Sequence, residues 1–236
     1  MKKWHSFVIL LLFPVLITSC SQKDNNPESS ENQDVVSLPG LSFMGPNTAS
    51  RDQYAAQTKS QISLANNYAQ IISSPFTHSQ PSKSGNTWNW IFEAGGGATE
   101  SLTAVKNTDG TISWEMILNG NIYGKNYSSW KVLDGTTSAD QKKGTWNIYD
   151  ENAAIPAARL SWISDESGAV YATLTTYSLS VLTGKKEIIN RPDKSGELKV
   201  YGDNGIETFQ AVWQSDGSGQ WKSYTNGQET AGGSWK

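Results

Sequence analysis

GTISWEMILNG, residues 110–120, decides the fold class of this chain of 236 residues. Every second residue in its centre is apolar, and Ser113 and Glu115 fall between the apolar positions. Successive side chains of a strand point to opposite faces of a sheet, so this period of two predicts a strand with one buried face. Trp114 then belongs to the core side and Glu115 to the solvent side. The apolar set is Ile112, Trp114, Met116 and Leu118.

The same alternation returns in TWNWIF (87–92), TWNIYD (145–150) and RLSWIS (159–164). Between such segments stand short runs of Asp, Asn and Ser that end in Gly, which supplies the positive φ of tight hairpins. The pattern predicts a mainly β fold, an antiparallel meander of about twelve strands that forms a barrel or half-barrel. The turn glycines are Gly110, Gly168, Gly196, Gly205, Gly219 and Gly227.

Four tryptophans follow one another at intervals of sixteen residues: Trp114, Trp130, Trp146 and Trp162. One short strand plus one connection has about this length, so the interval predicts that they lie on four successive strands. The interval continues in no clear register past Trp162. The pattern is therefore that of a decayed meander rather than an array of identical repeats.

Residues 48–74 have a helical period instead. Apolar residues recur there at steps of three and four, which predicts an amphipathic helix packed on the sheet or plugging the mouth of the barrel. Thr48 or Ser50 is expected to cap its start, and Pro75 and Pro81 are expected to end it. The apolar stripe consists of Tyr54, Ile62, Ala65, Tyr68, Ala69 and Ile72.

The first twenty residues read MKKWHSFVILLLFPVLITSC. Lys2 and Lys3 precede an apolar run that has the length of a signal-peptide core and is too short to span a membrane. Residues 17–20, Ile-Thr-Ser-Cys, resemble the lipobox of bacterial lipoproteins. The resemblance covers residues 1–20 and implies cleavage before Cys20 and attachment of acyl chains such as palmitate to it. Ser21, where an Asp favours inner-membrane retention, implies the outer membrane.

Composition divides the chain into three parts. Residues 1–19 are expected to be a signal peptide, residues 20–45 the lipidated cysteine with a flexible tether, and residues 46–236 a single helix-plus-meander domain. Cys20 is the one cysteine, so no internal disulfide is expected. Four apolar residues near the end of the tether are suited to dock on the domain. They are Leu38, Leu41, Phe43 and Met44.

Groups for catalysis and metal binding are scarce. The chain after the signal has one histidine, His78, as a candidate for a catalytic triad, and too few His and Cys for a zinc site. The Asp-x-Ser-Gly turns lack the spaced oxygen ligands of a calcium loop, and the run 95–97 (GGG) predicts a hairpin bend. We expect no enzyme activity, metal or cofactor. The acids within strands, candidates for a glycosidase pair, are Glu93, Glu115 and Glu207.

Aromatic residues are plentiful, with ten tryptophans in the chain. Most are expected to fill the core, and some could line a cavity for a hydrophobic ligand or stack on sugar rings. The aromatic residues near the C-terminus stand in polar stretches of sequence, which predicts that they are exposed. They are therefore the candidate ligand-binding residues. They are Trp213, Trp221, Trp235 and Tyr224, with Tyr201 beside them.

Together these features predict a non-enzymatic protein of the cell envelope that is held to the membrane by lipid on Cys20 and binds a hydrophobic ligand or an envelope partner. A surface carbohydrate-binding lipoprotein and a glycan hydrolase are the alternatives. The formal net charge is −3 and becomes −5 on loss of Lys2 and Lys3, which argues against nucleic acid as a partner. The sequence does not predict the oligomeric state.

Overall fold

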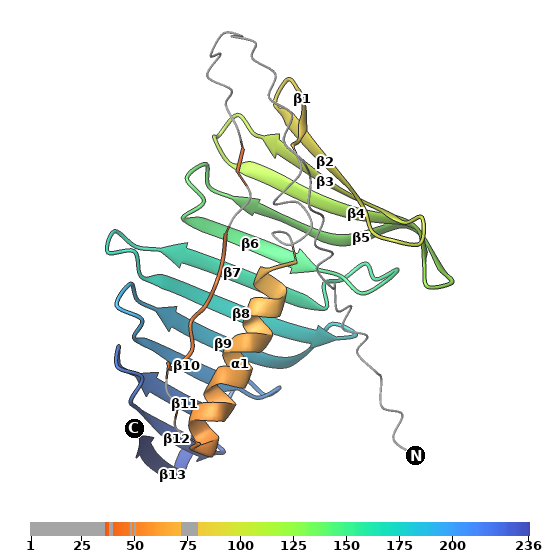
Figure 1. Cartoon of the computed structure of the whole chain (residues 1–236). Coiled ribbons are helices and arrows are strands. Elements are labelled where there is room, and N and C mark those ends of the chain that lie inside the picture. The colour runs from red at the N-terminus through yellow and green to blue at the C-terminus, as the bar shows by residue number, and fades with distance from the viewer. Residues whose placement is uncertain (1–35, 38–39, 48, 50, 72–79) are drawn as a thin grey trace, which may run out of the picture. The chain divides into compact units, whose positions relative to one another are not determined.

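The computed structural model describes residues 36–37, 40–47, 49, 51–71 and 80–236. They form one antiparallel sheet of thirteen strands, each hydrogen-bonded to its neighbours in chain order, with a single helix beside it (Figure 1). The predicted meander is confirmed. Among the described strands the first and the last do not pair, so the sheet is open rather than a closed barrel.

The strands are β1 (Ser82–Ser84), β2 (Thr87–Glu93), β3 (Thr99–Lys106), β4 (Ile112–Ile122), β5 (Lys125–Thr137), β6 (Lys143–Ile148), β7 (Ala158–Ser164), β8 (Val170–Ser178), β9 (Val181–Asn190), β10 (Gly196–Tyr201), β11 (Glu207–Trp213), β12 (Gly219–Thr225) and β13 (Gln228–Trp235). Residues 95–97 lie in the hairpin between β2 and β3, as their composition predicts.

The sixteen-residue interval does place its four tryptophans on four successive strands, β4 to β7. Trp114 and Trp146 lie in the main core with ring centroids 6.0 Å apart, and Trp162 follows at 5.3 Å from Trp146. Trp130 does not join them. It packs with Leu118 in a second, small cluster near the turn of the β4–β5 hairpin, where bulges shift the register between the two strands.

The inner face of the sheet is built from indole rings that lie over glycines of the adjacent strand. A methyl group added at Gly196, for example, would lie 2.7 Å from Cε2 of Trp213 and 2.5 Å from the Ile189 carbonyl oxygen. Glycine is therefore required there for space and not for a special backbone angle. Four directly opposed pairs share this arrangement: Gly135–Trp146, Gly144–Trp162, Gly196–Trp213 and Gly219–Trp235.

Three of these indoles also bind the hairpin that precedes the glycine. Nε1 of Trp162 donates to the Gln141 carbonyl oxygen at 3.1 Å, between β5 and β6. Trp213 donates to Lys194 at 3.0 Å and Trp235 donates to Gly217 at 2.8 Å, at the corresponding hairpins between β9 and β10 and between β11 and β12. The packing motif thus continues beyond Trp162, although the sequence interval stops there.

Helix α1 (Gln53–Ala69) is shorter than the 48–74 segment that its period predicts. The predicted caps are wrong, because Asp52 is the N-cap and its carboxylate accepts the Tyr54 amide at 2.7 Å. The helix ends at Ala69, before either proline. Its buried side packs on the sheet, and the Tyr54 ring stacks on Trp221 of β12 at 3.4 Å. Packing on the sheet is therefore the correct alternative, not plugging of a barrel.

Residues 36–37 and 40–47, here called the strap, lie against both the helix and the sheet. Asn66 of α1 binds the backbone of Phe43 through two hydrogen bonds of 2.7 Å. Asn190 of β9 does the same for Met44, at 2.6 and 2.8 Å. Val36 and Phe43 are buried. The compact unit therefore starts at Val36, earlier than the boundary at residue 46 that composition suggests.

The inner-face glycines differ in the space above them, which gives a direct test. We expect Gly196→Ala to lower the free energy of unfolding by about 1–3 kcal/mol, because the new methyl group displaces the Trp213 indole. Gly184→Ala, on the same face, is the control: its methyl group would lie 3.6 Å from its nearest neighbours. Denaturant unfolding of both variants measures the difference, and equal stabilities would contradict the packing described.

The two asparagines that bind the strap give a second test. Asn190→Ala leaves the partly buried amide and carbonyl of Met44 without these partners, so we expect a loss of about 1–2 kcal/mol. Hydrogen exchange at the Met44 amide should speed up well before exchange in the central strands. Asn204→Ala, which removes a bond to the Ile206 amide in an exposed hairpin, serves as the control. Unchanged exchange at the Met44 amide would mean that the Asn190 side chain does not hold the strap.

Candidate functional site

The late aromatics are less exposed than their polar flanks suggest. Trp213 and Trp235 are 0% and 3% exposed, so the predicted exposure is wrong for both. Trp221 and Tyr224 are half-buried: Trp221 lies under Tyr54, and the Tyr224 hydroxyl donates to Gln210 at 3.2 Å. The misleading polar neighbours belong to hairpin turns and to the opposite face of the sheet.

The three strand acids lie apart, on β2, β4 and β11. Glu115 points to solvent opposite Trp114, as predicted. Burial raises the pKa of Glu207; the nearby Lys199 acts against this and two neighbouring glutamates add to it. His78 lies outside the described residues. The structure thus brings no two of these three acids together.

The outer face of the sheet instead has a groove of about 480 Å³ over β3 to β6. Hydroxyl, amide and carboxylate side chains line it together with Val105, Trp114 and Gly135. Glu115 of β4 and Asp134 of β5 face each other directly across the strands. The polar lining residues are Thr103, Ser113, Glu115, Asp134, Thr136, Thr145 and Asn147.

Asp134 is the most strongly bonded group in the groove. Its carboxylate accepts hydrogen bonds from Lys131 Nζ at 2.7 Å, Asn147 Nδ2 at 2.8 Å and the Tyr149 hydroxyl at 2.8 Å. Burial acts to raise the pKa of Asp134, but these donors outweigh it and lower the pKa. Arg159 in turn donates to Asn147 Oδ1 at 2.9 Å. The groove therefore holds a fixed, ionised acceptor at neutral pH.

A row of short side chains, six of them hydroxyl-bearing, runs through the groove and along the sheet. Each position pairs directly with the next across neighbouring strands from β2 to β8, so the spacing is about 4.8 Å. Sequence reasoning missed this row because the register between strands cannot be read from any one strand. The row is Thr87, Val105, Ser113, Thr136, Thr145, Ser161 and Thr173.

The Asp-containing turns use their carboxylates to close hairpins, which confirms the structural interpretation of these motifs. Asp193 Oδ1, for instance, accepts both the amide of Ser195 at 2.9 Å and its hydroxyl at 2.7 Å. Within the described part of the chain no three His, Cys, Asp or Glu side chains are grouped so as to hold a metal ion. The turns of this kind contain Asp109, Asp140, Asp165, Asp193 and Asp216.

Comparison with known proteins adds no family: no protein-family model matches the sequence, and no functionally curated protein matches it significantly. The helix that the structure describes is neither long nor apolar enough to cross a membrane.

The Asp turns predict a pH dependence of stability. Hydrogen bonds from the Ser195 hydroxyl and amide lower the pKa of Asp193, and the other four turn aspartates shift in the same direction through equivalent bonds. A lowered folded pKa gives stability that is present above the ordinary Asp pKa of about 3.9 and is lost as pH falls through the folded value.

We therefore expect the free energy of unfolding to be steady near neutral pH and to fall progressively at acidic pH, from about pH 5 downward. Asp193→Asn keeps the turn acceptor but cannot titrate, so its unfolding curve should depend less on pH in this range. Urea titrations of both chains between neutral and acidic pH measure this. Parallel profiles for the two chains would contradict the assignment.

Proposed function

We propose that this chain is a non-enzymatic, lipid-anchored protein of the bacterial cell envelope that binds a glycan in the outer groove over β3 to β6. The observation that supports this most is the groove lining itself. Sugars present many hydroxyl groups, and protein sites for such ligands are concave with a few fixed donors and acceptors. The groove offers hydroxyls of Thr136 and Thr145 beside the ionised Asp134.

The inner tryptophans support a structural role for the aromatic residues of this chain. Trp146 and Trp213 fill the space above glycines of the neighbouring strands. The indole N–H of Trp213 also donates a hydrogen bond to the Lys194 carbonyl oxygen. Binding on the inner face would require these rings to leave their glycines. The outer face needs no such rearrangement, which favours it as the binding surface.

A second candidate, binding of a hydrophobic ligand, is favoured by a depression of about 470 Å³ between the strap and α1. Met44, which is 42% exposed, contributes apolar surface to it, and Lys59 and Lys194 contribute positive charge. An amphiphile with an acidic head group would match this lining. Uptake of a fluorescent fatty acid that competes with no glycan would support this candidate over the first.

A bulky substitution in the groove tests the glycan proposal. Thr145→Arg places a long side chain in the middle of the row, and we expect binding to any glycan identified on an array to weaken at least about tenfold, or ~1.4 kcal/mol. Ser234→Arg, on exposed β13, is the matched control. Circular dichroism confirms that both fold. Equal binding by the two variants, or no glycan bound by the parent chain, would reject the site.

A further inference from the structure

Large apolar side chains project from one end of the sheet. In a meander every second connection lies at the same end, so the hairpins β4–β5, β6–β7, β8–β9 and β10–β11 share it. Tyr123 and Leu179, at two of these tips, are 96% and 97% exposed. We call this end the apolar rim. Its exposed apolar residues are Tyr123, Ile155, Leu179, Val181 and Ile206.

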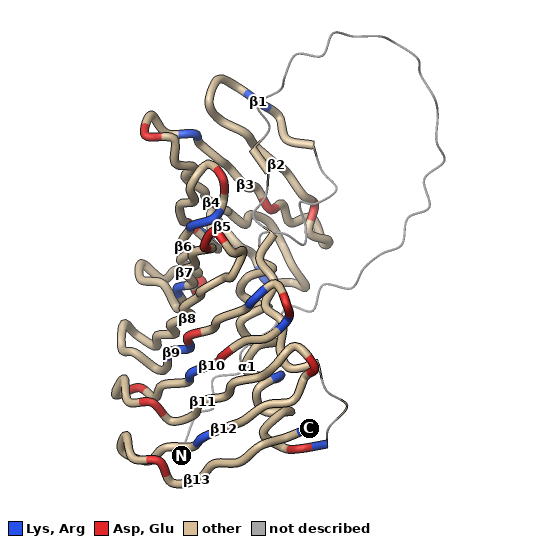
Figure 2. The backbone as a smooth tube through the Cα atoms, turned by 90° about the vertical axis from the view of Figure 1, so that its left-hand side faces the viewer, with Lys and Arg blue, Asp and Glu red and all other residues tan. Residues whose placement is uncertain are grey.

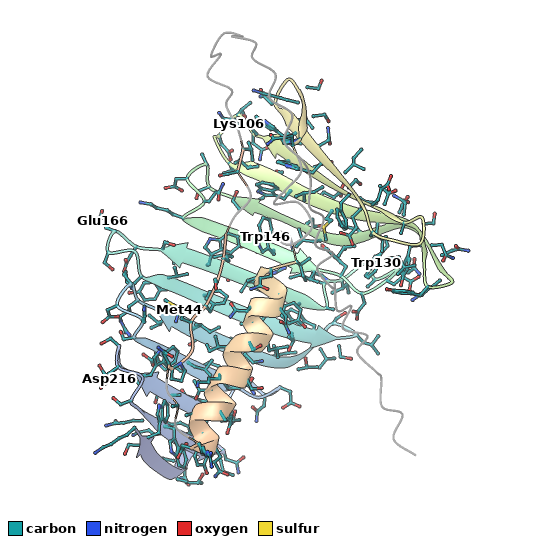
Figure 3. All side chains as sticks on the ribbon, in the orientation of Figure 1. Met44, Lys106, Trp130, Trp146, Glu166 and Asp216 are labelled. Atoms are coloured by element: carbon teal, nitrogen blue, oxygen red, sulfur yellow. The ribbon has the colours of Figure 1, made fainter. Side chains whose placement is uncertain are left out.

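The opposite end, called the acidic rim, consists of the five Asp-containing turns described above. Glu166 and Asp216 project from this end, on the left of the view, whereas Trp130 lies toward the other (Figure 3). Figure 2 looks onto this rim and shows acidic residues at several of its turns, with basic residues interspersed. Ile163 and Tyr171, 51% and 42% exposed, stand on the strands beside the Asp165 turn of the acidic rim, but no large exposed apolar side chain of the described residues lies at the tip of a turn there.

The backbone at the apolar tips is unusual for the residues found there. Tyr123 and Leu179 have φ angles of 49° and 50°, in the left-handed region that favours Gly and Asn. Neither turn formation nor core packing accounts for a fully exposed leucine in this conformation. Side chains that are costly to the turn and unused by the core are expected to serve an external contact.

We propose that the apolar rim inserts its tips into the interfacial layer of a lipid bilayer. The apolar side chains stand on separate hairpins whose spacing is two strands, roughly 10 Å. A fluid membrane surface accepts such separated side chains without a matching shape, and tyrosine is suited to the interface because one end is apolar and the other polar.

The length of chain before the strap permits this orientation. Residues 21–35 separate Cys20 from Val36, and fifteen extended residues reach about 50 Å. The chain enters the fold beside the acidic rim, where Gln141 binds the Ser37 carbonyl. The longest strand, β5, has 13 residues and spans about 43 Å. The inference rests on the proposed anchor for proximity to the membrane and does not depend on the glycan groove.

The test uses the full lipoprotein in vesicles of phosphatidylethanolamine and phosphatidylglycerol. Acylated Cys20 does not react with thiol reagents, so a fluorophore can be attached at Leu179→Cys, with Glu166→Cys as the control on the acidic rim. Nitroxide-labelled lipids should quench the label at position 179 at least severalfold more than the label at position 166. Equal quenching would overturn the proposal. Failure of the parent chain to float with vesicles would overturn the anchor and the rim together.

A second variant separates membrane contact from folding. Asn tolerates a positive φ, so the double variant Tyr123→Asn, Leu179→Asn should melt at the same or a higher temperature than the parent. In chains that begin at Ser21 and so lack both the signal and the lipid, we expect vesicle flotation to be weak with the native tips and to fall at least threefold with the Asn tips. Equal flotation of the two chains would overturn the insertion, whatever the glycan groove binds.

Discussion

The contact between an indole ring and a glycine on the next strand is the interaction on which the rest of this structure depends. Trp146 over Gly135 and Trp213 over Gly196 repeat the same arrangement in distant parts of the sheet. Burial of one such ring is worth about 3–5 kcal/mol when it is tested by truncation to alanine. Because the ring occupies the space of a missing side chain, each contact also fixes the register of its two strands.

The indole hydrogen bonds tie this packing to the hairpins. Trp162, Trp213 and Trp235 each donate to a turn carbonyl of the strand pair that precedes them. Every ring thus links its own strand to a hairpin formed by earlier strands. In this way the open sheet gains side-chain connections between neighbouring hairpins, which backbone pairing alone does not provide. The strap and α1 then cover apolar surface that the rings leave on the inner face.

With the inner face filled, the two surfaces that carry the proposals are consequences of the meander. Strand alternation sends the hydroxyl and carboxylate groups to the outer face, where cross-strand register aligns them into one groove. Connection alternation sends the Asp turns to one end and the apolar tips to the other. Neither surface comes from a single segment, and each depends on several hairpins repeating the same geometry.

The sequence by itself determined the class of fold, the core side of Trp114, the solvent side of Glu115 and the placement of four spaced tryptophans on successive strands, because a local period of two records which residues face inward. The sequence also indicated that Phe43 docks on the domain. Only the tertiary structure decided that Trp213 and Trp235 are buried, that Asp52 caps α1, and that Asn66 and Asn190 hold the strap. These outcomes depend on contacts between distant segments, such as Asn190 with Met44. The hydroxyl row and the apolar rim likewise arise from register and connection order across many strands, which no local pattern encodes.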